Sequence, residues 1–330
     1  MKMRKVLGLA AGLLLIVSLV LSSCGAEEES APELPPAELT EEICYGYSFG
    51  VPDYYSSNGF VINKDIKEGE RVSEIDGQAA LRITSKYSEL EADEFSGKAL
   101  EESGIADGLG AAELTTEEME IAGMPGMKAS CTNPDGNEVR AILFLNEDYK
   151  SITAVSMKEY SSETEKEHAY IDDFDLIPES IRTVGPEEHM AALGYTIDFP
   201  EYYEKFVPYI MGSDITYFCY AGADANTDVT ISEGAGADSL DRSEAGLEDS
   251  LRFDEETGID ISISDDIEKG PARIRQYSYS FSGMAAGGEG AFIYDTDKDI
   301  LISINLMESG NGDKDYSGDF RKMIRDLGVE

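Results

Sequence analysis

The sequence has 330 residues, and its 67 acidic residues against 26 Lys and Arg give a formal net charge of −41. Such a surface repels phosphate backbones and anionic lipid head groups, which argues against nucleic-acid binding and against a polybasic hold on a membrane. It favours cations, basic partners or simple solubility.

The first residues have the pattern of a lipoprotein signal. Three basic residues among the first five precede an uncharged run over 6–21, which ends at Leu-Ser-Ser-Cys24. A basic start, a short apolar run and small residues before a cysteine predict cleavage after residue 23 and diacylglycerol or palmitate on Cys24. We therefore expect residues 1–23 to be removed and the protein to be extracytoplasmic, anchored to the cell membrane through Cys24.

The following residues, 24–42, are acidic and rich in Pro, with almost nothing to bury, and they predict a disordered tether. Lipidation of Cys24 leaves three cysteines: Cys44, Cys131 and Cys219. Three thiols cannot all pair with one another, and the spacing leaves open whether Cys44 and Cys131 form a disulfide.

A ten-residue motif then occurs twice. Residues 46–55 read GYSFGVPDYY and residues 194–203 read GYTIDFPEYY, with five identical positions. Alternating apolar residues before a proline predict a half-buried strand that the proline ends. The segments 100–103 and 247–250 also correspond. Near the end of each half, the same i, i+4, i+7, i+11 spacing predicts one apolar face of a closing helix, and these positions are Tyr170, Phe174, Ile177 and Ile181 in the first half and Tyr316, Phe320, Met323 and Leu327 in the second.

Strand-like runs separated by turn residues lie before each closing helix, so each half is predicted to contain an antiparallel meander. The sequence therefore predicts a first domain over 43–183, a linker over 184–192 and a second domain over 193–330.

A strand with this Tyr-to-Pro pattern, followed by meandering strands and an amphipathic helix in about 140 residues, resembles the PsbP-like family. The resemblance covers most of residues 43–330 and implies an α+β fold, with two tandem α/β/α sandwiches in which helices cover an antiparallel sheet. It also implies a role in assembly or binding. It carries over no functional residue, and it does not imply photosynthesis.

The sequence contains few residues in catalytic patterns. His168 and His189 are the two histidines, and both are expected to be exposed and solvated. No zinc-binding spacing, nucleophile elbow, phosphate-binding loop or complete dinucleotide-binding motif occurs in the sequence. We therefore expect a protein that is not an enzyme and that needs no cofactor.

Two groups of residues are candidates for binding. Asp295, Asp297 and Asp299 place carboxylates at alternate positions, as a calcium loop does, but the glycine and glutamate that complete an EF-hand are missing, so a polar turn is the alternative. Four tyrosines after the repeated prolines form either a ligand-binding face or the rim of a core, and these are Tyr54, Tyr55, Tyr202 and Tyr203.

The sequence predicts a membrane-anchored lipoprotein that binds or helps assemble another envelope or secreted component. One alternative is a solute-binding lipoprotein for a cation or a basic small molecule. Another is a hydrolase without a recognisable motif.

Overall fold

The computed structural model describes residues 37–62, 69–95, 99, 114–161, 169–203, 205–211, 214–221, 224–251, 258–282, 286–309 and 314–330. Cys24, His168, the segment 100–103 and the predicted signal lie outside these residues. Within them, no helix combines the length and the apolar character that a membrane crossing requires. Residues Glu38–Glu330 form one compact unit.

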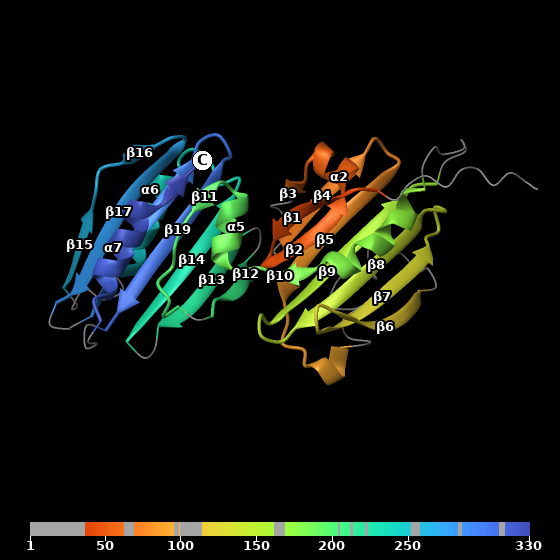
Figure 1. Ribbon diagram of the computed structural model, residues 1–330, viewed down its shortest axis with the longest axis horizontal. Helices are drawn as coiled ribbons and strands as arrows, with labels where there is room; N and C mark the ends of the chain where they lie inside the picture. Colours follow the sequence, from red (N-terminus) through yellow and green to blue (C-terminus); the bar gives the residue numbers. More distant parts are fainter. Residues whose placement is uncertain are drawn as a thin grey trace, which may run out of the picture. The chain divides into compact units, whose positions relative to one another are not determined.

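The first half contains a seven-stranded antiparallel sheet with the strand order β3-β4-β5-β9-β8-β7-β6 (Figure 1). A small sheet, β1-β2-β10, joins the start of this half to its end. The strands are β1 (Leu39–Cys44), β2 (Tyr47–Pro52), β3 (Val61–Ile62), β4 (Gly69–Ile75), β5 (Ala79–Tyr87), β6 (Thr115–Ile121), β7 (Met124–Thr132), β8 (Glu138–Asn146), β9 (Ser151–Glu159) and β10 (Arg182–Thr183).

The second half repeats this arrangement with the order β12-β13-β14-β19-β18-β17-β15, and β16 also pairs with β17. The small sheet β11-β20 again joins the start of the half to its end. The strands are β11 (Tyr195–Thr196), β12 (Val207–Met211), β13 (Asp214–Ala221), β14 (Ala225–Glu233), β15 (Ile259–Ile263), β16 (Ile267–Lys269), β17 (Ala272–Phe281), β18 (Gly287–Asp295), β19 (Ile300–Glu308) and β20 (Gly328–Val329).

The helical segments of the described residues are fewer than the strands. The α-helices are α2 (Asp53–Asn58), α5 (Pro186–Ala192), α6 (Ser239–Leu251) and α7 (Tyr316–Asp326), and the 3₁₀ segments are η1 (Ala92–Glu94), η2 (Tyr170–Leu176) and η3 (Pro178–Ser180). In the described part of the chain, each strand pairs only with strands of its own half, either before or after α5 in the sequence. The helix α5 occupies most of the predicted linker.

The predicted fold class, two α/β/α sandwiches, is wrong. Antiparallel strands dominate the described residues, and the helices found there are too few and too short to form a full layer on each face of the sheets. The exposure of the strands shows that the second face is covered only in part: β14 and β19 alternate between buried and half-exposed residues. The strand β18, against which α6 packs, is buried on both faces. The hydrophobic alternation of the sequence was compatible with either arrangement.

One boundary and one helix also differ from the predictions. Residues 39–42, assigned to the tether, belong to β1 and pair with β2. The closing helix of the second half is confirmed as α7, and Asp315 caps it by accepting a hydrogen bond from the Gly318 amide at 2.9 Å. In the first half, the closing segment is the 3₁₀ pair η2 and η3. Pro178 has no N–H to donate to the carbonyl of Phe174, which accepts from the Ile177 amide at 3.1 Å instead.

Each large sheet buries an apolar face against its closing segment. Phe174 and Ile177 of the first half and Phe320 and Met323 of the second lie in these cores. On the opposite face of the second sheet, α6 packs through Leu240 against aromatic side chains of β17 and β18.

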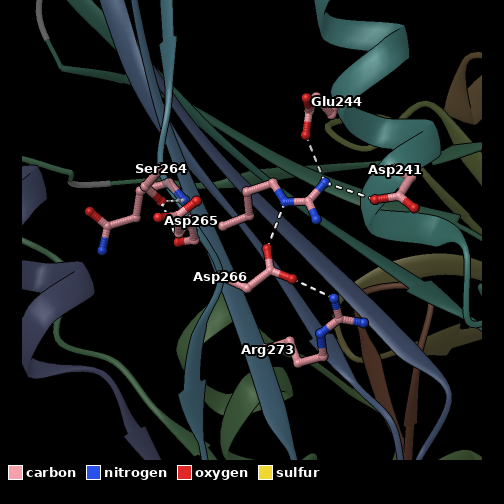
Figure 2. Close-up of polar contacts among 8 residues, drawn as sticks. Asp241, Glu244, Ser264, Asp265, Asp266 and Arg273 are labelled. Atoms are coloured by element: carbon pink, nitrogen blue, oxygen red, sulfur yellow. Dashed lines mark hydrogen bonds and ion pairs between the residues drawn. The ribbon is translucent and has the colours of Figure 1, made fainter.

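An ion-pair network holds α6 on this sheet (Figure 2). Arg275 of β17 donates to Asp241 at 3.0 Å and to Glu244 at 2.7 Å, both on α6, and to Asp266 at 2.7 Å. Asp266 also pairs with Arg273. The two arginines pair with all three of these carboxylates, two of which lie on α6, so the network holds α6 against the sheet.

Candidate binding cleft

A cleft of about 490 Å³ lies beside the linker. Three segments line it: Tyr149 in the turn between β8 and β9, the stretch 183–187 that leads into α5, and residues between β11 and β12. The last group comprises Phe199, Pro200, Glu201, Tyr203, Lys205 and Phe206. The volume of the cleft is within the range of small-ligand sites, roughly 300–1,000 Å³.

Aromatic rings form the apolar wall of the cleft. The Phe199 and Phe206 ring centroids are 4.9 Å apart, and Tyr203 lies 6.3 Å from Phe199 and 5.9 Å from Phe206. All three are partly buried against the core of the second half. The hydroxyl of Thr227 donates to the Tyr203 hydroxyl at 2.6 Å, which fixes the ring.

The charges at the cleft leave an excess of carboxylates. Lys205 pairs with Asp148 at 2.8 Å, and this hydrogen bond raises the pKa of Lys205, so the lysine charge is compensated locally. Glu187 is exposed and accepts a hydrogen bond from the Phe199 amide at 3.0 Å. Glu201 is also exposed and lines the cleft. Aromatic faces and carboxylates together suit an ammonium or guanidinium group.

Of the four predicted binding tyrosines, Tyr203 lines the cleft. The Tyr54 hydroxyl donates to Asp173 at 2.9 Å, and the Tyr202 hydroxyl donates to Asp319 at 3.2 Å, so both contact the closing segments of their halves. Burial, together with these carboxylates, raises the pKa of both hydroxyls. Tyr55 is fully buried.

The predicted calcium residues do not come together. Asp295 is fully buried and accepts hydrogen bonds from the Tyr195 hydroxyl at 2.7 Å and from the amides of Asp297 and Lys298. Burial raises the pKa of Asp295, but these hydrogen bonds outweigh it and leave the pKa lowered. Asp299 instead accepts from the Gly236 amide and the Tyr294 hydroxyl.

These contacts describe a turn held by its own side chains. Among the described residues, no group of three or more His, Cys, Asp or Glu side chains is placed to hold a metal ion.

His189 is buried, contrary to the expectation that it is solvated. It lies in α5 with 1% of its surface exposed, and its Nδ1 is 2.9 Å from the Tyr217 hydroxyl. Burial, with the nearby Arg71 charge, lowers the pKa of His189 to about 3. Among the described residues, Cys44, Cys131 and Cys219 form no disulfide.

A second cleft, of about 530 Å³, lies at one end of β17 and β18. Three of its four charged side chains already make internal contacts: Arg321 pairs with Glu289, and Glu308 accepts a hydrogen bond from the Ser317 hydroxyl at 2.7 Å. Because these groups are committed to internal contacts, the aromatic cleft is the stronger candidate.

Most residues of the cleft were not among the predicted binding residues. Phe199 and Phe206 flank the repeated Tyr-Tyr pair, and the aromatic density of FPEYYEKF was a signal for them. Tyr149 and the stretch 183–187 had no such signal, because only the folded chain brings them next to these residues.

No protein-family model matches the chain, and neither does any curated protein. Among solved structures, it is similar to the immunity protein TplEi of the T6SS from Pseudomonas aeruginosa in complex with "L" peptide, with 10% identity, a TM-score of 0.33, and coverage of 89% of this chain and 99% of that chain. The apo form of TplEi gives 10% identity, a TM-score of 0.30, and coverage of 88% and 97%.

A conserved hot dog fold protein from Alicyclobacillus acidocaldarius is also similar, with 10% identity, a TM-score of 0.18, and coverage of 71% of this chain and 93% of that chain. All three TM-scores are below 0.5, so these similarities carry no argument about function. The resemblance to PsbP-like proteins is not tested by these comparisons and stays a prediction.

Proposed function

We propose that this protein is an extracytoplasmic lipoprotein, anchored through Cys24, that binds a basic segment of another envelope or secreted protein in the aromatic cleft. It acts by binding and not by catalysis. The observation that carries the proposal is the combination of Phe199, Tyr203 and Phe206 with the carboxylates of Glu187 and Glu201.

The physical basis is charge complementarity at an apolar surface. An ammonium or guanidinium group over an aromatic ring gains about 0.5–2 kcal/mol, with the larger value where water is excluded. The cleft also lies on a chain of net charge −41, which accelerates the approach of a basic partner at low salt.

A direct binding measurement tests the proposal. Isothermal calorimetry with the mature chain should give saturable heat with a Lys-rich peptide that contains one Phe, and no heat with the same peptide after Lys→Gln replacement. Glu201→Gln and Phe206→Ala should each weaken binding about three- to thirtyfold, since each removes roughly one cation contact. Glu308→Gln, in the second cleft, is the matched control and should bind as the wild type does.

The second candidate is a lipoprotein that binds a basic small molecule and passes it to a transporter. The cleft volume of about 490 Å³ favours it, because this space accommodates a complete small ligand. Spermidine is the probe for this candidate. Saturable heat with spermidine and none with the peptide would favour it over the first.

The anchor is tested separately. Labelled palmitate should be incorporated into the full chain in cells and not into the Cys24→Ser variant. Equal labelling of the two chains would contradict the anchoring proposal.

A further inference from the structure

A set of buried polar contacts connects the two halves of the chain. Arg71 of β4 donates to Glu42 of β1 at 2.9 Å and also to Glu233 of β14, which belongs to the second half. The Arg71 side chain is only 9% exposed, and the two glutamates are 22% and 19% exposed. One guanidinium thus joins two carboxylates from opposite halves in a place with little water.

The linker contributes to the same region. His189 of α5 lies with its Nδ1 2.9 Å from the hydroxyl of Tyr217 on β13, and the two rings pack edge to face at 5.9 Å. Ile210 of β12 is buried in the core cluster of the first half, where Tyr47 also lies. We call these contacts, together with the close approach of Gly46 to Pro208 described next, the joint. Its residues are Glu42, Gly46, Arg71, His189, Pro208, Ile210, Tyr217 and Glu233.

Gly46 shows how closely the halves approach. A Cβ atom at this position would lie 2.9 Å from Pro208 Cγ, nearer than real Cβ atoms come to their neighbours. Gly46 also has φ +79°, a conformation that favours glycine. The motif that contains Gly46 therefore packs its backbone directly against β12 of the second half.

The cleft is built from the same segments as the joint. Phe206 immediately precedes β12, which carries Pro208 and Ile210 into the joint, and the cleft residue Glu187 lies in α5 with His189. A change in the angle between the halves would separate Tyr149 from Phe199 and Phe206.

We propose that the joint holds the two halves as one rigid body and thereby keeps the cleft preformed for its ligand. The ligand part of this inference rests on the proposed function, whereas the mechanical part does not. A preformed site binds more tightly because its side chains are already ordered before the ligand arrives.

Cys44 is a natural reporter of the joint. It is fully buried, and burial raises its pKa, with Arg71, Glu42 and Glu233 close enough to influence that pKa. Its thiol therefore reacts with iodoacetamide when the joint opens or when the core of the first half, to which it also belongs, unfolds. Cys219, buried in the second half, reports unfolding of that half.

The experiment measures the alkylation rate of each cysteine by mass spectrometry in the mature chain. Glu233→Gln should raise the Cys44 rate about tenfold, because it removes a charge-assisted hydrogen bond across the joint while leaving Arg71 paired with Glu42. Gly46→Ala should do the same through its contact with Pro208. In both variants the Cys219 rate should stay unchanged.

Two matched variants separate the joint from general effects. Gly77→Ala places a Cβ at φ +70° with nothing within 4 Å, so it carries the backbone strain of Gly46→Ala without the clash. Glu70→Gln removes a carboxylate with a 5% exposed side chain that pairs with Arg82 at 3.0 Å within the first half. Neither should alter the Cys44 rate.

The proposal is overturned if neither joint variant changes the Cys44 rate, or if Cys44 and Cys219 accelerate together. The same variants are then tested with the Lys-rich peptide. An opened joint with unchanged peptide affinity would overturn the preformed cleft. A wild-type chain that binds no peptide while its joint variants open would overturn the proposed function and leave the rigid body supported.

Discussion

The two halves share a strand order but carry different residues on the inward-facing side of their second strand, and one of these positions lies in the joint in both halves. Arg71 lies opposite Ile83, the fifth residue of β5, and Tyr217 lies opposite Val229, the fifth residue of β14. One copy therefore carries a charge where the other carries an aromatic ring. Both side chains lie in the joint, so the duplicated positions have diverged to contact the opposite half and the linker.

This difference indicates how a duplicated module becomes an asymmetric pair. Identical halves would present the same side chain on both sides of the contact, whereas Arg71 needs carboxylates and Tyr217 needs a hydrogen-bond partner. Glu42 and Glu233 supply the first, and His189 supplies the second. Replacing a buried ion pair by apolar residues often costs no stability, so we infer that the pairs of Arg71 serve mainly to select one arrangement of the two halves.

The largest expected effect comes from removing the charge. Arg71→Ala should lower the free energy of unfolding by about 3–5 kcal/mol, because two glutamates remain partly buried without their cation. Tyr217→Phe should cost about 1 kcal/mol, the contribution of one neutral hydrogen bond. Urea denaturation at pH 7 measures both.

Arg325→Ala is the control for the arginine, since Arg325 and its partner Asp326 are both more than half exposed. It should cost less than about 1 kcal/mol. If Arg71→Ala and Arg325→Ala destabilise the protein equally, the joint does not depend on the buried charge.

The second prediction concerns the pH dependence of stability. It tests the contribution of His189 separately from that of the Arg71 ion pairs. His189 has a pKa of about 3 in the folded chain, below its ordinary value of 6.5. The unfolded chain therefore binds a proton as the pH falls below 6.5 and the folded chain does not, so stability is lost between about pH 6.5 and pH 3. Between pH 6.5 and pH 5 the expected loss is about 2 kcal/mol.

Two other ionisable groups face His189 or its partners. Arg71 lowers the His189 pKa and stays charged throughout. Burial raises the pKa of Glu42, so its protonation opposes the histidine effect as the pH falls. Denaturation curves of wild type and His189→Gln at pH 7, 6 and 5 isolate the histidine contribution, and parallel pH profiles would show that His189 is not the group responsible.

The sequence predicted the duplication because its signal is local: GYSFGVPDYY and GYTIDFPEYY differ at five positions and form corresponding strands in corresponding small sheets. The helix α7 was predictable for the same reason, with an apolar spacing and an N-terminal Asp. The 3₁₀ form of η2 was not predicted, because its apolar spacing is the same as that of α7 and does not distinguish the two kinds of helix.

The joint could not be predicted from the sequence. Arg71 and Glu233 are 162 residues apart, and among 67 acidic residues nothing marks Glu42 or Glu233 as partners of one arginine. The sequence around His189 indicated an exposed side chain, since this residue lies in a polar segment with Pro and Glu neighbours. Burial of such residues depends on contacts between distant segments, which no local pattern records.

The smallest expected effect tests whether the repeated tyrosines keep one structural role. Tyr54 and Tyr202 each pack on a second tyrosine, at 4.8 and 4.7 Å, and each donates to an aspartate of the closing segment, at 2.9 and 3.2 Å. Tyr54→Phe should cost about 1 kcal/mol and Tyr202→Phe about 0.5 kcal/mol, because the hydrogen bond of Tyr202 is longer and more exposed. Thermal unfolding of the two variants measures this difference.

Since Tyr202 does not line the cleft, Tyr202→Phe should also leave binding of the Lys-rich peptide unchanged. Tyr209→Phe is the control, because that tyrosine is 44% exposed and should change neither property. Loss of peptide binding in Tyr202→Phe without loss of stability would place the ligand at the repeated tyrosines. The two halves would then differ in function as well as in their contacts at the joint.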